Sequence, residues 1–389
     1  MIYNSLRLEL TGVCNYQCLY CHASEKNTKL YRKQQLSFGR MLQLISEAKA
    51  LGVKNFILTG GEPFLNKNWD RIAEYCGQDS RVVISTNGSH FTEENLNKLK
   101  KLPQVSEFRT SLDGLETNDI IREGSNYRES IDAIKRIKEY LPDSKIMVQT
   151  VLYKQNIAEL VPLYEELKKL KISRWRLSQL WKTVRTKNNA HILNFSDYDL
   201  MFDIYENIIK RYQLDNFPFR LGIDNVYDSF ITKEDYVDMD LNTHPCLYEF
   251  DYLCINANGD IIFCPALNKP MANVKSQSIK DAVENSEWFS DFKRITIESL
   301  NCKGCRYIKI CGGGCRADAL RWMGNIRAED VNSCCMMVRV EKRIVPLLTT
   351  EEQKAYNNLI DIKGYYPRVE GDNIEEVINN HERRAKKWH

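Results

Sequence analysis

The chain has 389 residues, of which 43% are hydrophobic, and a formal net charge of +3, so a packed core is expected and neither nucleic acid nor an acidic membrane surface is predicted as a partner. It contains no secretory signal pattern and no apolar stretch of roughly eighteen residues, which predicts a cytoplasmic protein without membrane contact. In that compartment, thirteen cysteines indicate metal ligation rather than disulfides.

The first half of the chain alternates β-rich apolar runs with amphipathic helical patterns. Strands are predicted at Leu6–Leu10, Asn55–Thr59, Val82–Thr86, Glu107–Leu112, Lys145–Leu152 and Trp175–Leu180. Helices are predicted between them at Phe38–Leu51, Glu93–Lys101, Arg128–Tyr140 and Ile157–Leu170, with Ser37 and Thr92 as N-caps. Six strand–helix repeats predict an α/β fold with a parallel sheet, either a partial barrel or a doubly wound sheet.

The pattern changes at about residue 196. A helix is predicted at Tyr198–Tyr212, followed by a loop-rich stretch, a cysteine-rich region from about His244 to Cys335 and a helical tail. We therefore expect four units, comprising residues 1–195, 196–243, 244–340 and 341–389.

Three cysteines, Cys14, Cys18 and Cys21, directly follow the first predicted strand. Iron–sulfur clusters usually take four cysteine ligands, so a loop with three leaves one iron open, which is what a catalytic metal site needs. Zinc is the alternative, because His22 could supply the fourth ligand of a structural zinc site.

Polar or glycine-rich motifs follow the next three predicted strands. They read Thr59-Gly60-Gly61-Glu62-Pro63, Ser85-Thr86-Asn87-Gly88 and Ser111-Leu112-Asp113-Gly114. The carboxyl ends of parallel strands lie at one edge of the sheet, so all three motifs should face the same mouth as the cysteine loop. Two adjacent glycines let backbone groups approach a ligand closely, and the Glu62 carboxylate could meet an ammonium group. Each motif alone could be an ordinary turn.

The C-x3-C-x2-C spacing with Tyr20 before the last cysteine, together with the three strand-end motifs, resembles the radical S-adenosylmethionine (radical SAM) superfamily. The resemblance implies a partial (β/α)6 TIM-type barrel and a catalytic [4Fe–4S] cluster on Cys14, Cys18 and Cys21 that binds S-adenosylmethionine. It implies cofactor contacts from Tyr20, Gly60, Gly61, Glu62, Pro63, Ser85, Asn87, Ser111, Asp113 and Arg122. Arg122 resembles a recurrent arginine of related enzymes, although it could also be a surface charge.

A second group of cysteines, at positions 246, 254, 264, 302, 305, 311, 315, 334 and 335, resembles the SPASM domain, a C-terminal extension that houses two auxiliary [4Fe–4S] clusters. By that resemblance the first auxiliary cluster uses Cys246, Cys254, Cys264 and Cys315. The second uses Cys302, Cys305, Cys311 and either Cys334 or Cys335. Glycines 312–314 would permit tight wrapping between neighbouring clusters. The alternative is a zinc ribbon on Cys302, Cys305, Cys311 and Cys315. Cys76, in a helical pattern, should be a buried core thiol.

The resemblance implies reductive cleavage of S-adenosylmethionine to a 5′-deoxyadenosyl radical that abstracts a substrate hydrogen, with flavodoxin or ferredoxin as electron donor. The favoured substrate is a ribosomally made peptide, oxidised or cross-linked through a thioether, carbon–carbon or ether bond. Pro265 after Cys264 argues against sulfatase activation, since such relatives place an Asp there. The short N-terminus suggests that any leader peptide is bound either by a separate protein or by the barrel and the cysteine-rich domain.

Two alternatives stay open. One is dehydrogenation or epimerisation of a small molecule such as a sugar, and the other is a non-catalytic zinc-binding interaction module. No catalytic acid or base can be named from the sequence. Residues late in the barrel, namely Trp175, Arg176, Gln179 and Trp181, could line a substrate pocket, although alternating residues on a barrel strand are more often core.

Overall fold

A single sheet organises the chain in this computed structural model, which describes residues 3–21, 35–180, 191–227, 240–246, 252–264, 266–267, 269–367 and 376–377. Its strands follow the order β10-β9-β8-β1-β2-β3-β4-β5-β6-β7. Their bounds are β1 Ser5–Glu9, β2 Asn55–Thr59, β3 Arg81–Ser85, β4 Val105–Ser111, β5 Lys145–Leu152, β6 Arg174–Gln179, β7 Arg220–Ile223, β8 Tyr252–Ile255, β9 Asp260–Ile262 and β10 Pro270–Asn273. Strands β1 to β7 pair in parallel, β8 is parallel to β1, and β9 and β10 are antiparallel.

The six predicted strands are present, and the predicted α/β class with a parallel sheet is confirmed. The sequence did not reveal β7 or β8, because each has only four residues and lies in a loop-rich or cysteine-rich stretch. These two strands extend opposite ends of the parallel array. Since β8 pairs with β1, the cysteine-rich region is joined to the first strand of the barrel.

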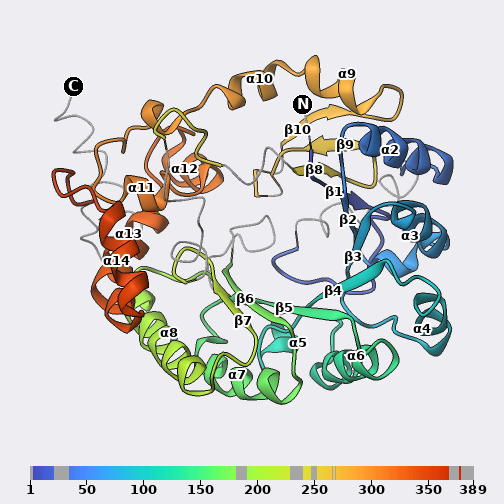
Figure 1. Cartoon of the computed structure of the whole chain (residues 1–389), viewed down its shortest axis with the longest axis horizontal. Helices are drawn as coiled ribbons and strands as arrows, with labels where there is room; N and C mark the ends of the chain where they lie inside the picture. Colours follow the sequence, from blue (N-terminus) through green and yellow to red (C-terminus); the bar gives the residue numbers. More distant parts are fainter. Residues whose placement is uncertain are drawn as a thin grey trace.

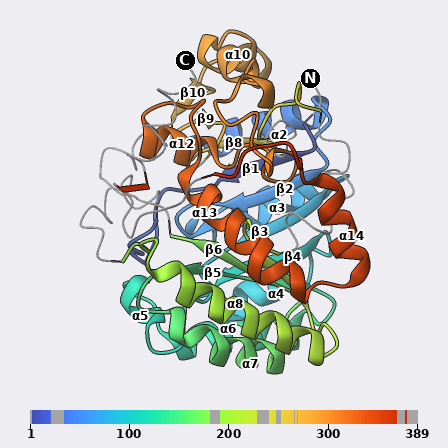
Figure 2. The ribbon, with the colours of Figure 1, turned by 90° about the vertical axis from the view of Figure 1, so that its left-hand side faces the viewer.

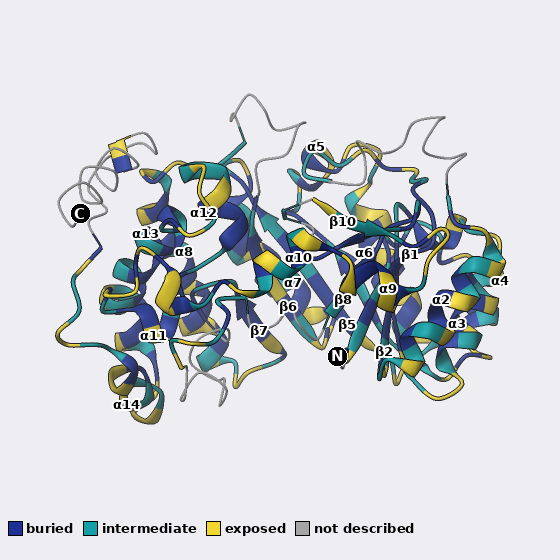
Figure 3. Ribbon diagram, turned by 90° about the horizontal axis from the view of Figure 1, so that it is seen from above, coloured by how far each residue is buried: buried dark blue, intermediate teal, exposed yellow. Residues whose placement is uncertain are grey.

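Helices cover the outer side of the parallel strands, as Figure 1 shows. They are α2 Phe38–Ala50, α3 Trp69–Gly77, α4 Glu93–Leu99, α6 Tyr127–Tyr140 and α7 Leu160–Lys169, with 3-10 turns at Pro63–Leu65 and Ile157–Glu159. The short helix α5 (Asn118–Ile121) instead lies beside the cysteine loop, where the Leu19 N–H donates to the Ile121 carbonyl at 2.8 Å. Ser37 and Thr92 cap α2 and α4 as predicted, each accepting a backbone hydrogen bond. Strand alternation explains the layering: Leu6 and Leu8 of β1 are fully buried and belong to the hydrophobic core. Figure 3 shows buried strands between helices with exposed outer faces.

Helix α8 (Asp197–Leu214) links the parallel strands β6 and β7 and packs against both α7 and the C-terminal helical turns. The remaining helices are α9 Ile279–Glu284, α10 Glu287–Lys293, α11 Ile308–Cys311, α12 Arg316–Met323, α13 Val331–Arg339 and α14 Thr350–Leu359, with a π-helical turn at Val340–Ile344 and 3-10 turns at Ile297–Ser299 and Val345–Leu347. Two ion pairs join these elements: Arg339 Nε lies 2.8 Å from Asp199, and Arg343 Nε lies 2.6 Å from Glu206. Figure 2 shows α13 and α14 on the same side of the molecule as α8.

After α14 the chain returns to the cysteine-rich region. The Arg306 N–H donates to the Tyr365 carbonyl and the Tyr365 N–H donates to the Gly304 carbonyl, each at 3.0 Å. The predicted helical tail is therefore helical as far as Leu359 and then pairs with residues beside Cys305, while positions 368–375 and 378–389 lie outside the described residues. In the described part of the chain, no helix is long and apolar enough to cross a membrane.

Candidate active site

Gly60 and Gly61 lie against the backbone of the cysteine loop. The Gly61 N–H donates to the Thr11 carbonyl at 2.7 Å, and the Glu62 N–H donates to the Val13 carbonyl at 2.8 Å. A Cβ on Gly60 would lie 2.3 Å from the Thr11 carbonyl oxygen, and one on Gly61 would lie 2.2 Å from that of Val13. In the structure, these glycines therefore allow the strand end to approach the loop that carries Cys14.

Glu62 is fully buried and joins two strand ends. Its carboxylate accepts hydrogen bonds from the Thr86 hydroxyl at 2.7 Å and the Asn87 N–H at 2.8 Å. Burial raises the pKa of Glu62 to about 7, although these hydrogen bonds oppose the shift. Asn87 in turn directs its amide Nδ2 toward the Cys14 sulfur at 3.7 Å, so the second and third motifs both reach the cysteine loop.

Asp113 has no exposed surface and both of its carboxylate oxygens accept hydrogen bonds. The Tyr20 hydroxyl donates to Oδ2 and the Val151 N–H donates to Oδ1, each at 2.6 Å. This geometry makes Asp113 an anchor between the cysteine loop and the ends of β4 and β5. Burial and the Asp113 charge raise the pKa of Tyr20 well above its usual range, so its hydroxyl remains a donor.

Arg122 is 1% exposed, so the surface-charge alternative is wrong. Its guanidinium donates to the Ser111 carbonyl, lies 3.9 Å from Asp113 and stands over the Tyr16 ring. Its Nε has no hydrogen-bond partner among the described residues. Burying an arginine with an unused donor costs free energy unless an acceptor or a negative charge is supplied. The charge of Arg122 also lowers the pKa of the nearby Cys18 thiol, although burial raises that pKa by more.

The three loop cysteines are each half-buried and free of disulfides. Burial raises the pKa of Cys14 to about 11. Iron binds thiolates and not thiols, so coordination to iron would offset the free-energy cost of ionising the buried Cys14 thiol. Among the described residues, no group of three or more His, Cys, Asp or Glu side chains is arranged to hold a single metal ion. The thiol set and the unused Arg122 donor fit an anionic iron–sulfur group; the ligand roles stay a prediction.

Four cysteines of the C-terminal region lie close enough to act on one another electrostatically. The Cys334 thiol interacts with those of Cys302, Cys305 and Cys311, and Cys311 interacts with the first two. Burial raises the pKa of Cys302 to about 12, and it raises those of Cys311 and Cys334 well above the ordinary value. This is the set predicted for the second auxiliary cluster.

The two adjacent cysteines on α13 face different surroundings. Cys334 interacts electrostatically with the three other thiols, whereas Cys335 is fully buried and interacts with Arg339, Asp330 and Tyr198. Consecutive helix residues point about 100° apart, so only one of the two can face the cysteine group. The arrangement favours Cys334 as the fourth ligand.

The cysteines predicted for the first auxiliary cluster come from several elements. Cys315 precedes α12 and interacts with Cys264, which follows β9. Cys254 lies on β8, in register with Arg7 of β1. The Cys246 N–H donates to His244 Nδ1 at 3.0 Å. The structure thus brings Cys264 and Cys315 together and places Cys254 at the edge of the barrel.

The residues suggested as pocket-lining have different positions. Trp175 is fully buried, donates its Nε1 to the Thr150 hydroxyl at 2.8 Å and packs on Tyr164 and Phe219, so it is core. Arg176 is exposed on the opposite face of β6 and forms an ion pair with Asp224. Gln179 directs its amide toward the sulfurs of Met201 and Met336. Trp181 lies outside the described residues.

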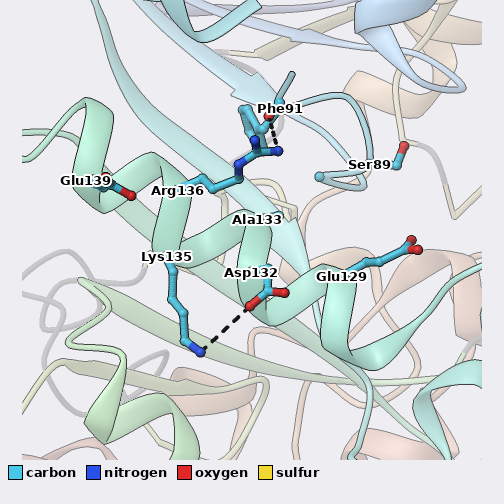
Figure 4. A pocket seen from close by; sticks show the side chains of 9 residues that line it. Ser89, Phe91, Glu129, Asp132, Ala133, Lys135, Arg136 and Glu139 are labelled. Carbon is cyan, nitrogen blue, oxygen red and sulfur yellow. Dashed lines mark hydrogen bonds and ion pairs between the residues drawn. The ribbon is translucent and has the colours of Figure 1, made fainter. Parts of the chain in front are cut away.

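One cavity of about 430 Å³ lies beside the third motif, between Gly88 and helix α6 (Figure 4). Asp132, Lys135 and Arg136 are among its lining residues. Lys135 lies 3.7 Å from Asp132, and Arg136 donates to the Phe91 carbonyl. Opposite charges on α6 therefore compensate one another, and no predicted cysteine ligand lines this cavity.

The sequence analysis did not identify several buried residues that hold the predicted site residues in place. Asn156 is fully buried, and its amide Nδ2 donates to the Asp113 carbonyl at 2.6 Å. Its position after β5 follows the same strand-end rule as the other motifs and could have been noticed. Arg316 and Asp330, both buried beside the C-terminal cysteines, carried no signal beyond proximity in the sequence.

Comparison with known proteins agrees with this arrangement. Residues 8–167 match the radical SAM superfamily and residues 246–306 match the SPASM iron–sulfur cluster-binding domain. The AdoMet-dependent heme synthase of Methanosarcina barkeri (strain Fusaro / DSM 804) is 25% identical over 83% of this chain and 93% of that relative.

Two solved structures share the fold. AnSMEcpe with bound AdoMet has a TM-score of 0.72 and 16% identity, covering 97% of this chain and 99% of that protein. Streptococcus suis SuiB bound to its precursor peptide SuiA has a TM-score of 0.65 and 18% identity, covering 86% and 76%. The chain therefore carries a radical SAM domain over residues 8–167, followed by a SPASM domain over residues 246–306.

Proposed function

We propose that the chain cleaves S-adenosylmethionine reductively and uses the resulting 5′-deoxyadenosyl radical to oxidise or cross-link a ribosomally made peptide in the cytoplasm. The observation that carries this is the docking of the Cys14–Cys21 loop onto three strand-end motifs, combined with a separate convergent group of four cysteines. When bound, a [4Fe–4S] cluster with an open iron supplies the electron for cofactor cleavage, and closed clusters supply sites for electron transfer.

The residues have distinct proposed roles. Cys14, Cys18 and Cys21 hold the catalytic cluster. Gly60, Gly61, Glu62, Pro63, Asn87 and Asp113 keep the loop and the strand ends in place. Ser85, Ser111, Tyr20 and Arg122 line the cofactor side. The auxiliary sites use Cys246, Cys254, Cys264 and Cys315, and Cys302, Cys305, Cys311 and Cys334. The catalytic unit spans residues 1–195, the connecting unit 196–243, the auxiliary unit 244–340 and the tail 341–389.

The peptide substrate is supported by the fold shared with SuiB, which was solved with its precursor peptide, and by the complete set of eight auxiliary cysteines. A small-molecule substrate is the second candidate, because similarity to the heme synthase extends over most of both chains. Flavodoxin or ferredoxin is the proposed electron donor. A separate protein is proposed to present the peptide.

The function is tested by anaerobic reconstitution, iron and sulfide analysis, and a cofactor cleavage assay with dithionite or flavodoxin. The wild type is expected to bind about twelve irons, four for each of three clusters, and to form 5′-deoxyadenosine. Deuterium transfer from labelled candidate peptides or tetrapyrroles into 5′-deoxyadenosine then separates the two substrate classes. Zinc without iron, and no cleavage product, would contradict the proposal.

A further inference from the structure

Arg316 is an almost fully buried cation inside the auxiliary region, with 1% of its surface exposed. It directly follows Cys315 and begins helix α12. Burying a guanidinium is costly unless its donors are satisfied and its charge is compensated. A structural or chemical role of Arg316 must therefore offset the cost of its burial.

Backbone carbonyls satisfy most of its donors. Nη1 donates to the carbonyls of Ile326 and Ala328 at 2.9 and 2.8 Å, and Nη2 donates to the carbonyl of Gly313. Gly313 lies between Cys311 and Cys315, while Ala328 lies in the segment that leads to Cys334. The guanidinium thus connects the two pieces of chain that carry Cys311 and Cys334.

The charge itself is not neutralised by a carboxylate within ion-pair distance in the described part of the chain. The third donor, Nε, has no hydrogen-bond partner among the described residues. Carbonyl oxygens are neutral acceptors, so the positive charge remains available to its surroundings. The guanidinium lies against the Gly313 carbonyl, two residues after Cys311, and its charge acts on the thiols of Cys302 and Cys311.

We propose that Arg316 is a positioning residue that supplies a fixed positive charge to the second auxiliary cluster and raises its reduction potential. The inference rests on the proposed function, since it needs that cluster to be held by Cys302, Cys305, Cys311 and Cys334. One added electron makes the cluster one unit more negative, and a nearby buried cation stabilises that state more than the oxidised one. Net charge and hydrogen bonding near the sulfurs are among the determinants of cluster potentials.

The test is a potentiometric titration of reconstituted full-length protein followed by electron paramagnetic resonance. Arg316→Gln removes the charge and Arg316→Lys retains it while losing the fork of hydrogen bonds. Arg343→Gln is the matched control, because it removes an arginine that is paired with Asp203 and Glu206 on α8. Iron content is measured for every variant, so that loss of a cluster is not mistaken for a shift in potential.

We expect Arg316→Gln to make reduction of the second auxiliary cluster at least tenfold less favourable, a shift of 59 mV or more for one electron. Arg316→Lys and Arg343→Gln should stay within threefold of the wild type. Equal shifts in the Gln and Lys variants, or loss of about four irons in both, would assign Arg316 a purely structural role and overturn the inference. Failure of the wild type to bind auxiliary iron would instead contradict the proposed function.

Discussion

The two cysteine regions of this chain are built differently although each contains a buried arginine. Cys14, Cys18 and Cys21 lie on one short loop that is held from outside by strand ends, and all three are half-buried. Cys302, Cys305 and Cys311 lie on one short segment, Cys334 is added from helix α13, and Cys302 and Cys305 are buried. A loop of three ligands leaves a face open to an exchangeable ligand, whereas four converging thiols close their site.

The contrast extends to the arginines. Arg122 lies beside Asp113, which partly compensates its charge, and borders the loop of three cysteines. Arg316 is anchored only by carbonyl oxygens in the described part of the chain and borders the group of four. Under the proposed roles, similar residues serve a cofactor-binding site in one region and a closed cluster site in the other. The following experiments test that difference.

The largest effect is expected from replacing Cys14, Cys18 and Cys21 together with alanine. Cofactor cleavage should fall to background, while about eight of twelve irons remain because the auxiliary sites are separate. Iron analysis and quantification of 5′-deoxyadenosine check this. Loss of nearly all iron would show that the two regions depend on one another for assembly.

Gly61→Ala should damage the open site selectively. Its Cβ would lie 2.2 Å from the Val13 carbonyl oxygen, so the cysteine loop must move, and we expect a loss of about 2–4 kcal/mol in unfolding free energy. Denaturant unfolding of the apoprotein measures it. Gly39→Ala in helix α2 is the control, since its Cβ would meet nothing within 4 Å. The idea fails if both variants behave alike.

The variants Cys334→Ser and Cys335→Ser test which of these two adjacent cysteines is a ligand of the second auxiliary cluster. The first should lower iron content by up to about four atoms per chain, because Cys334 interacts electrostatically with the other three thiols. The second should retain all iron and lose only core packing. Iron content and resonance spectra of both variants give the answer, and the reverse result would exchange the two assignments.

The smallest effect is expected from Tyr20→Phe, which removes the 2.6 Å hydrogen bond to Asp113. A buried bond to a charged group contributes about 1.5–3 kcal/mol, and the variant leaves the ring in place. The affinity for S-adenosylmethionine and the thermal unfolding temperature should both fall. Tyr140→Phe is the control, because the Tyr140 hydroxyl has no hydrogen bond in the described residues. If Tyr20→Phe binds the cofactor as tightly as the wild type, the Tyr20–Asp113 hydrogen bond does not contribute to the cofactor site.

Much of this architecture could be predicted, because strand and helix periodicities were strong and the polar motifs followed the strands. Strand β2, Asn55–Thr59, has the predicted bounds, and the burial of Cys76 is confirmed. What could not be predicted depends on contacts between distant segments. The roles of Gly61 and Arg122 depend on what the folded chain places beside them. Strand β8 was obscured because its pairing partner, β1, is far away in the sequence.

The pairing of β8 with β1 also constrains the order of assembly. Strand β1 is synthesised first, yet one of its two edges stays unpaired until residues 252–255 have emerged. An unpaired strand edge can associate with other chains during synthesis. The segment around Tyr365 must likewise arrive before the residues beside Cys305 gain their backbone partners. Iron loading into the completed scaffold is therefore expected to follow translation, and a chaperone that protects the first strand would increase the yield of active protein.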